Sequence, residues 1–364
     1  MCDILPELNG KDYIVDVNEK YDIHFCEMNE VDELVDFLDK YWRKDHIFTL
    51  SRKLLDFQHR DEACDRYNFV IAKNRVSGEI HSILGFVPTY QFDKEIKNAE
   101  VWPCIWKSRD DIPVKGLGVS LYHYLKENIQ IETISILGIS EIALSIYKHW
   151  NFSTGKMEHF FLPNFAKKDF HILKGKFIPS TLERKDSMKL EEMGQTEFEK
   201  LDEMALLNSM NRYKSKKYYI NRFFKHPMYE YRFLAIKEED STKLVLTARV
   251  CTVNEFSCLR IVDCIGDISV LKNVTHALQK YMENEDLEYI DFIEVGLDEE
   301  SLIHAGFINR KQTDAIVPNY FEPFLQENID LDYAYKTVLE EKNAIFFKAD
   351  ADQDRPNMIT NGTL

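Results

Sequence analysis

The stretch Ile112–Asn128, IPVKGLGVSLYHYLKEN, combines residue types that could bind an anion. Lys115 precedes two glycines one residue apart, Gly116 and Gly118, and the following residues have helical spacing. Glycines let a backbone approach a ligand closely, and the first N–H groups of a helix lack intrahelical acceptors. A strand, a glycine turn and a helix in this order therefore predict a phosphate-binding turn. Its residues would be Val114, Lys115, Gly116, Leu117, Gly118 and Val119.

Two established phosphate-binding patterns fit this stretch poorly. A dinucleotide-binding fingerprint needs a third glycine at the start of the helix, where this sequence has Leu121. A Walker loop needs Gly-Lys-Ser/Thr, which the sequence lacks. A lone Gly-x-Gly can also be an ordinary turn between a strand and a helix. The surrounding sequence is therefore needed to distinguish a phosphate-binding turn from an ordinary one.

A second motif follows the turn. Ser140, Ala143, Tyr147, Asn151 and Phe152 have the spacing Ser-x-x-Ala-x-x-x-Tyr-x-x-x-Asn-Phe. Together with the turn, this order resembles the GNAT superfamily of acyl-CoA-dependent N-acyltransferases. The two motifs of that family read Gln/Arg-x-x-Gly-x-Gly/Ala and, roughly, Asn-x-x-Ala-x-x-x-Tyr-x-x-x-Gly-Phe.

The sequence departs from the family pattern at three positions. Pro113 stands where the family has Gln or Arg, although Lys115 keeps a cation beside the first glycine. Ser140 replaces Asn, and Asn151 replaces Gly. Asparagine is the usual non-glycine residue that tolerates left-handed backbone geometry. The resemblance spans residues 21–162 and extends more faintly into the second half of the chain.

The resemblance implies that acyl-CoA is a co-substrate and that its pyrophosphate lies on the glycine turn. The strand before the turn contains Pro103, and a proline inside a strand is typical of an edge or a bulge. In GNAT enzymes this strand is bulged and parts from the next one, and a freed backbone N–H polarises the thioester carbonyl. Core packing is the alternative role for the two tryptophans of this strand. The residues expected beside the cofactor are Trp102, Cys104, Ile105, Trp106 and Ser140.

Tyr147, by the same resemblance, would donate a proton to the departing thiolate. Simple packing on an amphipathic helix is the alternative. GNAT general bases often lie between the hairpin and the bulged strand, which makes Asp93, Glu95, Glu100 and His81 the candidates here. A mechanism without a protein base, in which the thiolate of coenzyme A takes the proton, also stays open.

The elements that would position these residues occur twice in the sequence. Tyr67–Phe92 and Tyr231–Phe256 each read as a strand, a polar turn and a second strand, and they have identical residues at five matching offsets. Ser140–Phe152 and Asp298–Ile308 each follow an apolar strand and read as a short helix that ends on a small residue and Phe. The two ordered matches predict a duplicated unit.

The predicted fold class is therefore α/β (α+β, mixed sheet), with two tandem GNAT-like units. The second unit is expected to be degenerate, because it lacks the Gly-x-Gly turn and has Leu302 at the position of Tyr147. The boundary is placed near Ile178. Residues 1–177 would form a GNAT-like acyl-CoA-binding domain, and residues 178–364 a degenerate GNAT-like domain that binds a nucleotide-linked sugar.

The second copy carries a cationic, aromatic stretch, SKKYYINRFFKHPMYEY, and a C-terminal acidic run, ADADQDRPN. Arginine and aromatic rings suit a diphosphate and a base, and carboxylates could accept hydrogen bonds from sugar hydroxyls. An amphipathic helix and a disordered acidic tail are the alternatives. The acidic run lacks the glycine and glutamate of a calcium loop, so no metal is expected. The predicted acceptor-binding residues are Lys217, Tyr219, Arg222, His226, Cys251, Tyr320, Phe321, Asp350, Asp352, Asp354, Arg355 and Asn357.

Composition limits the possible partners. The chain has 364 residues, of which 45% are hydrophobic, and a net charge of −16, which disfavours nucleic-acid binding. Seven cysteines occur without a CxxC pair, which argues against structural zinc and against a disulfide framework. No apolar run is long enough to span a bilayer, and the N-terminus lacks a signal-peptide pattern. A cytoplasmic protein without a membrane partner is expected.

The predicted function is the transfer of an acetyl or 3-hydroxybutyryl group from acyl-CoA to an amino sugar. The resemblance to tandem GNAT enzymes implies a nucleotide-linked acceptor, dTDP-4-amino-4,6-dideoxyglucose. Another small amine as acceptor and a non-catalytic acyl-CoA sensor are the alternatives. A sensor would not need Tyr147. An aminoacyl transferase that uses tRNA would need a basic surface, which the charge of −16 opposes.

Overall fold

The computed structural model describes residues 17–97, 99–178, 185–202, 214–339 and 344–358. The chain divides into two compact units. Unit 1 takes the described residues up to Gly155, together with those of 332–342 and 356–364. Unit 2 takes those of 156–331 and 343–355. Within the described residues, no helix is long and apolar enough to cross a membrane.

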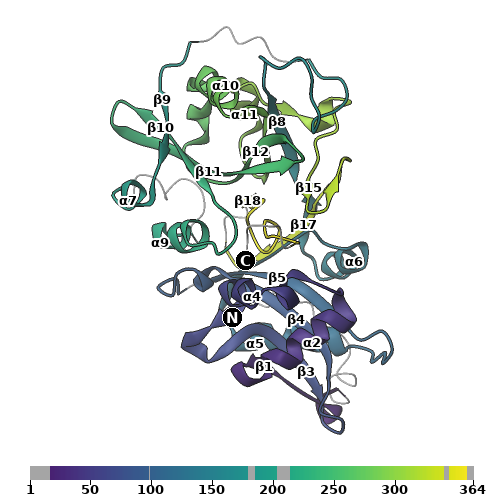
Figure 1. Cartoon of the computed structure of the whole chain (residues 1–364). Helices are drawn as coiled ribbons and strands as arrows, with labels where there is room; N and C mark the ends of the chain where they lie inside the picture. Colours follow the sequence, from purple (N-terminus) through teal and green to yellow (C-terminus); the bar gives the residue numbers. More distant parts are fainter. Residues whose placement is uncertain (1–16, 98, 179–184, 203–213, 340–343, 359–364) are drawn as a thin grey trace. The chain divides into compact units, whose positions relative to one another are not determined.

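Unit 1 is built on a mixed sheet in the order β1-β3-β4-β5-β6-β17-β7, with β2 beside β3 (Figure 1). The pairs from β1 to β5 are antiparallel, β5 and β6 are parallel, and β6 and β17 are antiparallel. A single parallel pair in the middle of the sheet is possible because a helix connects its two strands. The strands are β1 (Tyr21–Glu27), β2 (Arg60–Asp61), β3 (Arg66–Asn74), β4 (Ile80–Pro88), β5 (Ala99–Ser108), β6 (Ile131–Leu137), β7 (Ser153–Lys156) and β17 (Asp332–Thr337).

Helices cover both faces of this sheet. On one face, α5 and α6 bury Leu121 and Trp150 against Val70, Phe86 and Ile134 of the strands. The shorter helices α2 to α4 follow β1 in sequence; α2 packs on β4, α4 packs on β3 and β4, and α3 packs on α2 and α4. The helices are α2 (Val31–Phe37), α3 (Ile47–Leu50), α4 (Arg52–His59), α5 (Leu117–Asn128) and α6 (Glu141–His149), with the short turns η1 (Met28–Glu30), η2 (Leu38–Trp42), η3 (Glu62–Cys64) and η4 (Thr89–Gln91).

Unit 2 repeats the same plan, with the order β14-β8-β13-β12-β11-β10-β9 and β18 beside β13. Again one pair, β12 and β13, is parallel. Its strands are β8 (Glu158–Pro163), β9 (Lys189–Met193), β10 (Arg232–Glu238), β11 (Ser241–Val253), β12 (Phe256–Gly266), β13 (Leu287–Val295), β14 (Ile308–Asn309) and β18 (Phe346–Phe347), with the separate hairpin β15 (Tyr320–Phe321) and β16 (Phe324–Leu325). Its helices are α7 (Gln195–Phe198), α9 (Lys216–Tyr219), α10 (Thr275–Asn284) and α11 (Glu299–His304), with η5 (Ile220–Phe224), η6 (Ile268–Asn273) and η7 (Arg310–Gln312).

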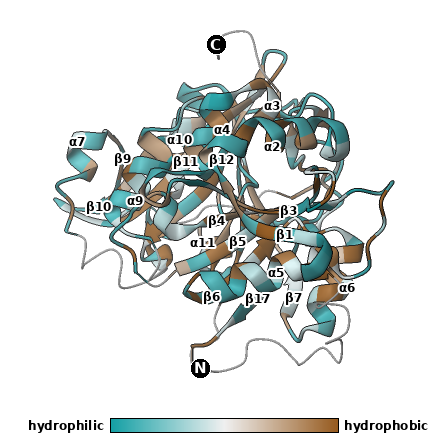
Figure 2. Cartoon of the chain, turned by 90° about the horizontal axis from the view of Figure 1, so that it is seen from below, coloured by the Kyte–Doolittle hydropathy of each residue, from teal (hydrophilic) through white to brown (hydrophobic). Residues whose placement is uncertain are grey.

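Hydrophobic residues lie along the strands and the inner faces of the helices, and hydrophilic residues lie on the outer faces (Figure 2). Each unit has its own apolar core between its sheet and its helices. The predicted fold class, two tandem GNAT-like units with mixed sheets, is confirmed by this arrangement.

The ends of α6 and α11 show the duplication at atomic detail. The N–H of Phe152 donates to the carbonyl of Tyr147 at 3.1 Å, and the N–H of Phe307 donates to that of Leu302 at the same distance. Asn151 has φ 55°, the left-handed geometry expected of it, and a glycine with φ 91° takes its place in unit 2. Leu302 therefore occupies the position of Tyr147, as the sequence comparison predicted.

The sheets divide the chain differently from a single boundary at residue 178. β8, which follows the first copy, pairs with β13 of unit 2, and β17, which follows the second copy, pairs with β6 of unit 1. Each copy thus lacks its own last strand, and a strand from beyond the other copy fills the place. Residues 156–177 belong to unit 2, and residues 332–342 belong to unit 1.

Candidate active site

The two parallel strands of unit 1 part from each other halfway along. β5 pairs with β6 at Ala99, Glu100 and Val101, and the pairing ends there, although β5 continues to Ser108. Backbone N–H and C=O groups of β5 that point toward β6 beyond Val101 therefore have no ladder partner in this described part of the chain. Such groups form a gap in the sheet that an extended ligand could pair with.

A bulge lies in β5 just beyond this point. Two residues, Cys104 and Ile105, oppose the single Gly85 of β4. Pro103 precedes them and has no N–H for the ladder. A Cβ at Gly85 would lie 2.7 Å from a ring carbon of Phe69 and 3.2 Å from Sγ of Cys104, so only glycine fits opposite the bulge. The bulge, which Pro103 predicted, and the parting of the strands, which the resemblance to GNAT enzymes implied, are both present.

The glycine turn is tied to the bulged strand. Gly116 has φ 83°, a left-handed geometry that glycine adopts without strain, and it forms the N-cap of α5. The indole N–H of Trp106 donates to the carbonyl of Gly118 at 3.2 Å. A Cβ at Gly118 would lie 3.0 Å from that indole nitrogen. The turn and the strand thus form one rigid piece.

The first turn of α5 offers donors to an anion. The helical bonds begin with the N–H of Ser120, which donates to the carbonyl of Gly116 at 2.9 Å. The N–H groups of Gly118 and Val119 precede it and have no intrahelical acceptor. Lys115 is exposed beside them. With the positive end of a 12-residue helix, this arrangement favours a phosphate or another anion.

Tyr147 lies buried on α6 in an aromatic cluster. Its ring centroid lies 6.1 Å from that of Trp106, 6.5 Å from that of Tyr122 and 5.0 Å from that of Phe152. Burial, with a smaller contribution from Cys104, raises the pKa of the Tyr147 phenol well above its usual value. The phenol is therefore protonated at neutral pH and could act as a proton donor, but not as a base.

Glu100 is the best-placed carboxylate of the predicted set. It is buried on β5, one residue before the strands part, and the hydroxyl of Ser135 on β6 donates to its Oε1 at 2.5 Å. Ser135 was missed in the sequence. The alternation of apolar and hydroxyl residues in IETISIL is the signal that could have indicated it.

The other predicted bases lie in different surroundings. Asp93 is buried and its Oδ1 accepts from the N–H of Glu95 at 3.0 Å, which is a local turn, whereas Glu95 is exposed. The hydroxyl of Tyr21 lies within hydrogen-bond distance of Nδ1 of His81, at 3.0 Å. His81 lies four residues along β4 from Gly85, roughly 13 Å from the bulge. Burial, then Arg109, lowers the pKa of His81.

Ser140 has a structural role at the start of α6. Its hydroxyl accepts from the N–H of Ala143 at 3.4 Å and so caps the helix. This capping bond accounts for Ser at the position where the family has Asn. A contact of Ser140 with coenzyme A remains a prediction.

Unit 2 has the same gap, but its own C-terminal segment fills it. β12 and β13 pair in parallel up to Ile261 and Phe292. Beyond that point β18 pairs with β13 at Glu294 and Val295, and the N–H of Ala349 donates to the carbonyl of Val262 on β12 at 2.9 Å. In each unit the parallel strands pair at one more position after the one compared here. In unit 1 that compared position is Glu100 opposite Thr133, and in unit 2 it is Arg260 opposite Asp291. The second copy therefore has an arginine in place of Glu100, as it has Leu302 in place of Tyr147.

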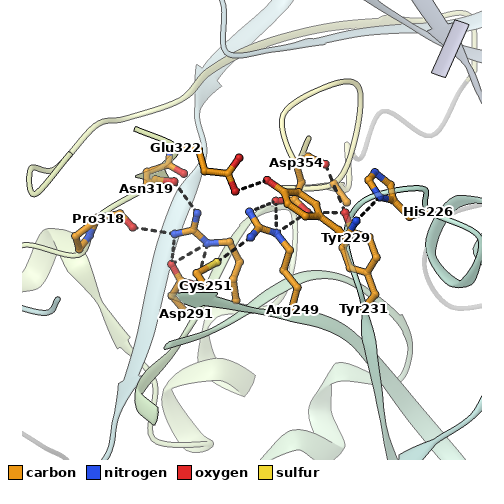
Figure 3. A network of polar contacts seen from close by, with 12 residues as sticks. His226, Tyr229, Tyr231, Arg249, Cys251, Asp291, Pro318, Asn319, Glu322 and Asp354 are labelled. Atoms are coloured by element: carbon orange, nitrogen blue, oxygen red, sulfur yellow. Dashed lines mark hydrogen bonds and ion pairs between the residues drawn. The ribbon is translucent and has the colours of Figure 1, made fainter. Parts of the chain in front are cut away.

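Buried ion pairs hold the C-terminal segment in this gap. Nζ of Lys214 lies 2.6 Å from a carboxylate oxygen of Asp263 and 2.6 Å from one of Asp350. Arg249 binds Asp354 through two nitrogens, at 2.9 and 2.8 Å, and the hydroxyl of Tyr231 donates to the same carboxylate at 2.8 Å (Figure 3). The side chains of all these ion pairs are buried.

Several predicted acceptor-binding residues therefore have partners inside the protein. Asp350 and Asp354 were expected to accept from sugar hydroxyls, but both are buried in ion pairs that fix the segment. Tyr219 donates to Asp263 at 2.9 Å, and Arg222 donates to the carbonyl of Asp354 at 3.4 Å. The acidic C-terminal run thus forms internal contacts and is not an open, solvent-exposed segment.

The remaining predicted residues divide by exposure. Nδ1 of His226 accepts from the backbone N–H of Tyr229 at 2.8 Å, and burial lowers its pKa to about 2. Cys251 is buried, and a guanidinium nitrogen of Arg249 lies 3.1 Å from its sulfur. Half-buried or exposed residues are Lys217, Tyr320, Phe321, Asp352, Arg355 and Asn357, the last of which belongs to unit 1.

Solved structures with a similar fold are N-acyltransferases by their descriptions. A GCN5-related N-acetyltransferase from Anabaena variabilis ATCC 29413 superposes with a TM-score of 0.52 at 10% identity, over 88% of this chain and 73% of its own. An Enterococcus faecalis V583 protein, described as a "probable N-acyltransferase", superposes with a TM-score of 0.50 at 9% identity, over 87% and 73%. These likenesses establish a GNAT-like fold. Neither the protein-family models nor the curated proteins searched give a match.

We expect Lys214→Met to loosen unit 2 selectively, because it leaves two buried carboxylates without their cation. The expected loss is about 3–5 kcal/mol, the range for breaking a buried ion pair. Hydrogen exchange of peptides from β12, β13 and β18 measures it. All four tryptophans, Trp42, Trp102, Trp106 and Trp150, lie in unit 1, so their fluorescence reports on the other unit.

The matched control is Lys280→Met, which changes an exposed lysine of α10 and should alter stability by less than about 0.5 kcal/mol. Unchanged exchange in Lys214→Met would mean that the ion pairs do not hold the C-terminal segment.

Proposed function

We propose that this protein is an acyl-CoA-dependent N-acyltransferase whose donor site lies in unit 1. One observation carries the proposal. A single strand, β5, parts from its parallel neighbour after Val101, bulges at Cys104, and through Trp106 is bonded to the glycine turn that opens α5. The strand thereby places an open edge and an anion-binding turn on one rigid piece. A molecule with an extended amide chain and a pyrophosphate fits both.

Each part of the donor has a group to bind it in this proposal. The pyrophosphate lies against the N–H groups of Gly118 and Val119 at the positive end of α5, with Lys115 beside it. The pantetheine arm pairs with the open edge of β5 as an added strand would. The thioester carbonyl reaches the bulge at Cys104 and Ile105, where a freed backbone N–H binds its oxygen.

The proposed reaction is a direct attack of the acceptor amine on the thioester. Glu100 takes the proton from the amine, directly or through one water, so that the nitrogen has a free electron pair. The new C–N bond forms at the carbonyl carbon, and the oxyanion stays bound at the bulge. When the C–S bond breaks, Tyr147 donates its proton to the thiolate, and the second proton of the attacking nitrogen returns to the phenolate through a water as the amide forms. The products are an amide and free coenzyme A.

The position of Tyr147 in the motif on α6 is the support for the role of proton donor, and burial, which raises the pKa of its phenol, keeps it protonated at neutral pH as that role requires. A sensor that only binds acyl-CoA would need neither Tyr147 nor a buried carboxylate at the parting of the strands. Glu100 with Ser135 at that point therefore favours catalysis.

For the acceptor we propose a nucleotide-linked amino sugar of the dTDP-4-amino-4,6-dideoxyglucose class, as in dTDP-anthrose biosynthesis, with an acetyl or 3-hydroxybutyryl donor. The support is the sequence resemblance together with half-buried groups of unit 2. Tyr320 and Phe321 offer rings to a base, and Arg355 offers a guanidinium to a diphosphate. Another small amine is the alternative acceptor.

Gly118→Asp should weaken acetyl-CoA binding at least tenfold. The new carboxylate would lie against the pyrophosphate, and a tenfold loss needs only ~1.4 kcal/mol. Isothermal titration calorimetry with acetyl-CoA measures the affinity. Gly194→Asp is the matched control, because a Cβ at Gly194 meets nothing within 4 Å and aspartate is a good N-cap for α7. Unchanged affinity in folded Gly118→Asp would exclude the donor site proposed here.

Tyr147→Phe should lower kcat about 100-fold and leave both KM values nearly unchanged, because the phenol acts only when the C–S bond breaks. Release of free coenzyme A, followed with a thiol reagent, measures the rate. Tyr122→Phe is the control: that phenol is also buried, in the same cluster, and has no partner in the described residues. A kcat within twofold of wild type in Tyr147→Phe would return this residue to packing.

Arg355→Ala tests the acceptor. If the guanidinium binds a diphosphate, the substitution raises KM for the dTDP-amino sugar about tenfold and leaves KM for acetyl-CoA unchanged. Initial rates with each substrate varied in turn separate the two. A larger effect on acetyl-CoA, or no turnover of any nucleotide-linked amino sugar by the wild type, would contradict this acceptor while leaving acyl transfer itself open.

A further inference from the structure

Lys348 is a buried lysine of unit 2 without a carboxylate of its own. It follows β18 and is 2% exposed. Its ammonium lies 5.3 Å from the centroid of the Tyr320 ring, and no described residue accepts a hydrogen bond from it. The other buried lysine of this unit, Lys214, contacts two carboxylates at 2.6 Å. The difference singles out Lys348, since a buried charge normally has a partner.

The carboxylates near Lys348 have arginines as their direct partners. Arg260 binds Asp291 at 2.6 Å and Arg249 binds Asp354 at 2.8 Å. Neither carboxylate is left to Lys348. An anionic group that entered here would give the ammonium a partner of its own.

Asn319 adds a second unpartnered polar group. It is 3% exposed, and neither the oxygen nor the nitrogen of its side chain has a partner in the described residues. Figure 3 shows Asn319 beside Pro318 and Glu322. The backbone carbonyl of Asn319 accepts from Arg260 at 2.6 Å, and the next residue, Tyr320, places its ring beside Lys348. Buried amides almost always have partners, so an unpartnered one indicates a ligand or a water.

We propose that unit 2 holds a site for a single oxyanion, a carboxylate or a phosphate group, bound by the ammonium of Lys348 and the amide N–H of Asn319. The site lies in unit 2, outside the donor site proposed for unit 1, and shares the ring of Tyr320 with the acceptor site proposed above. Tyr320 forms one wall, and the aromatic ring stabilises the ammonium when the anion is absent.

Binding of an anion at this site takes up a proton. Burial, then Arg260, lowers the pKa of Lys348 to about 7, while Asp354 and Asp291 oppose the shift. His159, which contacts Asp291, stays neutral because burial lowers its pKa as well. At pH 8 the amine is mostly neutral, and a bound anion raises its pKa. Affinity therefore falls as the pH rises above 7.

Calorimetry of the full chain with inorganic phosphate and, separately, with acetate at pH 8 tests the proposal. At least one of the two should bind, with uptake of close to one proton, measured by comparing buffers of different ionisation enthalpy. Phosphate alone or acetate alone identifies which oxyanion the site takes. Lys348→Met should weaken the binding at least tenfold, and Asn319→Ala about threefold or more. Lys280→Met, exposed on α10, should leave it unchanged.

Binding of neither anion would overturn the proposal, and so would equal binding by wild type and Lys348→Met, which would mark an adventitious ion only. If Lys348→Met fails to fold, hydrogen exchange of the wild type decides: the anion should protect the peptides that contain Asn319 and Lys348. Acetyl-CoA affinity, which belongs to unit 1, should stay the same in folded Lys348→Met, so failure here and failure of the donor site are distinguishable.

Discussion

The parting of two parallel strands is the feature on which the rest of this structure depends. A sheet that opens leaves backbone N–H and C=O groups without partners, and such groups must be satisfied. Unit 1 leaves the edge of β5 beyond Val101 open and places the glycine turn next to it. Unit 2 closes the equivalent gap with β18. The same fold thus gives one unit suited to an extended ligand and one unit that supplies its own.

The two units differ in the charged groups that lie at their gaps. Near the gap of unit 1 lie Glu100 with Ser135 and the N–H groups at the start of α5, and these N–H groups suit a ligand that carries its own negative charge. In unit 2 buried ion pairs such as Lys214 with Asp263 hold the inserted segment. In a protein of net charge −16, local groups of this kind, and not the overall field, decide where an anion binds.

Features of the fold that depend on local stereochemistry could be predicted from the sequence. Pro103 indicated the bulge, the two glycines at 116 and 118 the turn before α5, and Asn151 the left-handed end of α6, because each depends on the backbone of a few residues. The exchange of β8 and β17 and the insertion of β18 depend on contacts between residues far apart in the chain, which a single sequence does not encode visibly. For the same reason the acidic run around Asp354 suggested a ligand, whereas its partners are internal. Glu100 was one of several candidate bases until its position at the parting of the strands distinguished it.

A crystal structure with a non-hydrolysable thioether analogue of acetyl-CoA would test the donor site proposed for unit 1. We expect the pyrophosphate at the N–H groups of Gly118 and Val119, the pantetheine arm paired with β5, and the acyl oxygen within ~3 Å of a backbone N–H at the bulge. Residues 346–349 should still fill the gap of unit 2. An analogue bound in place of that segment, with the edge of β5 empty, would contradict the account.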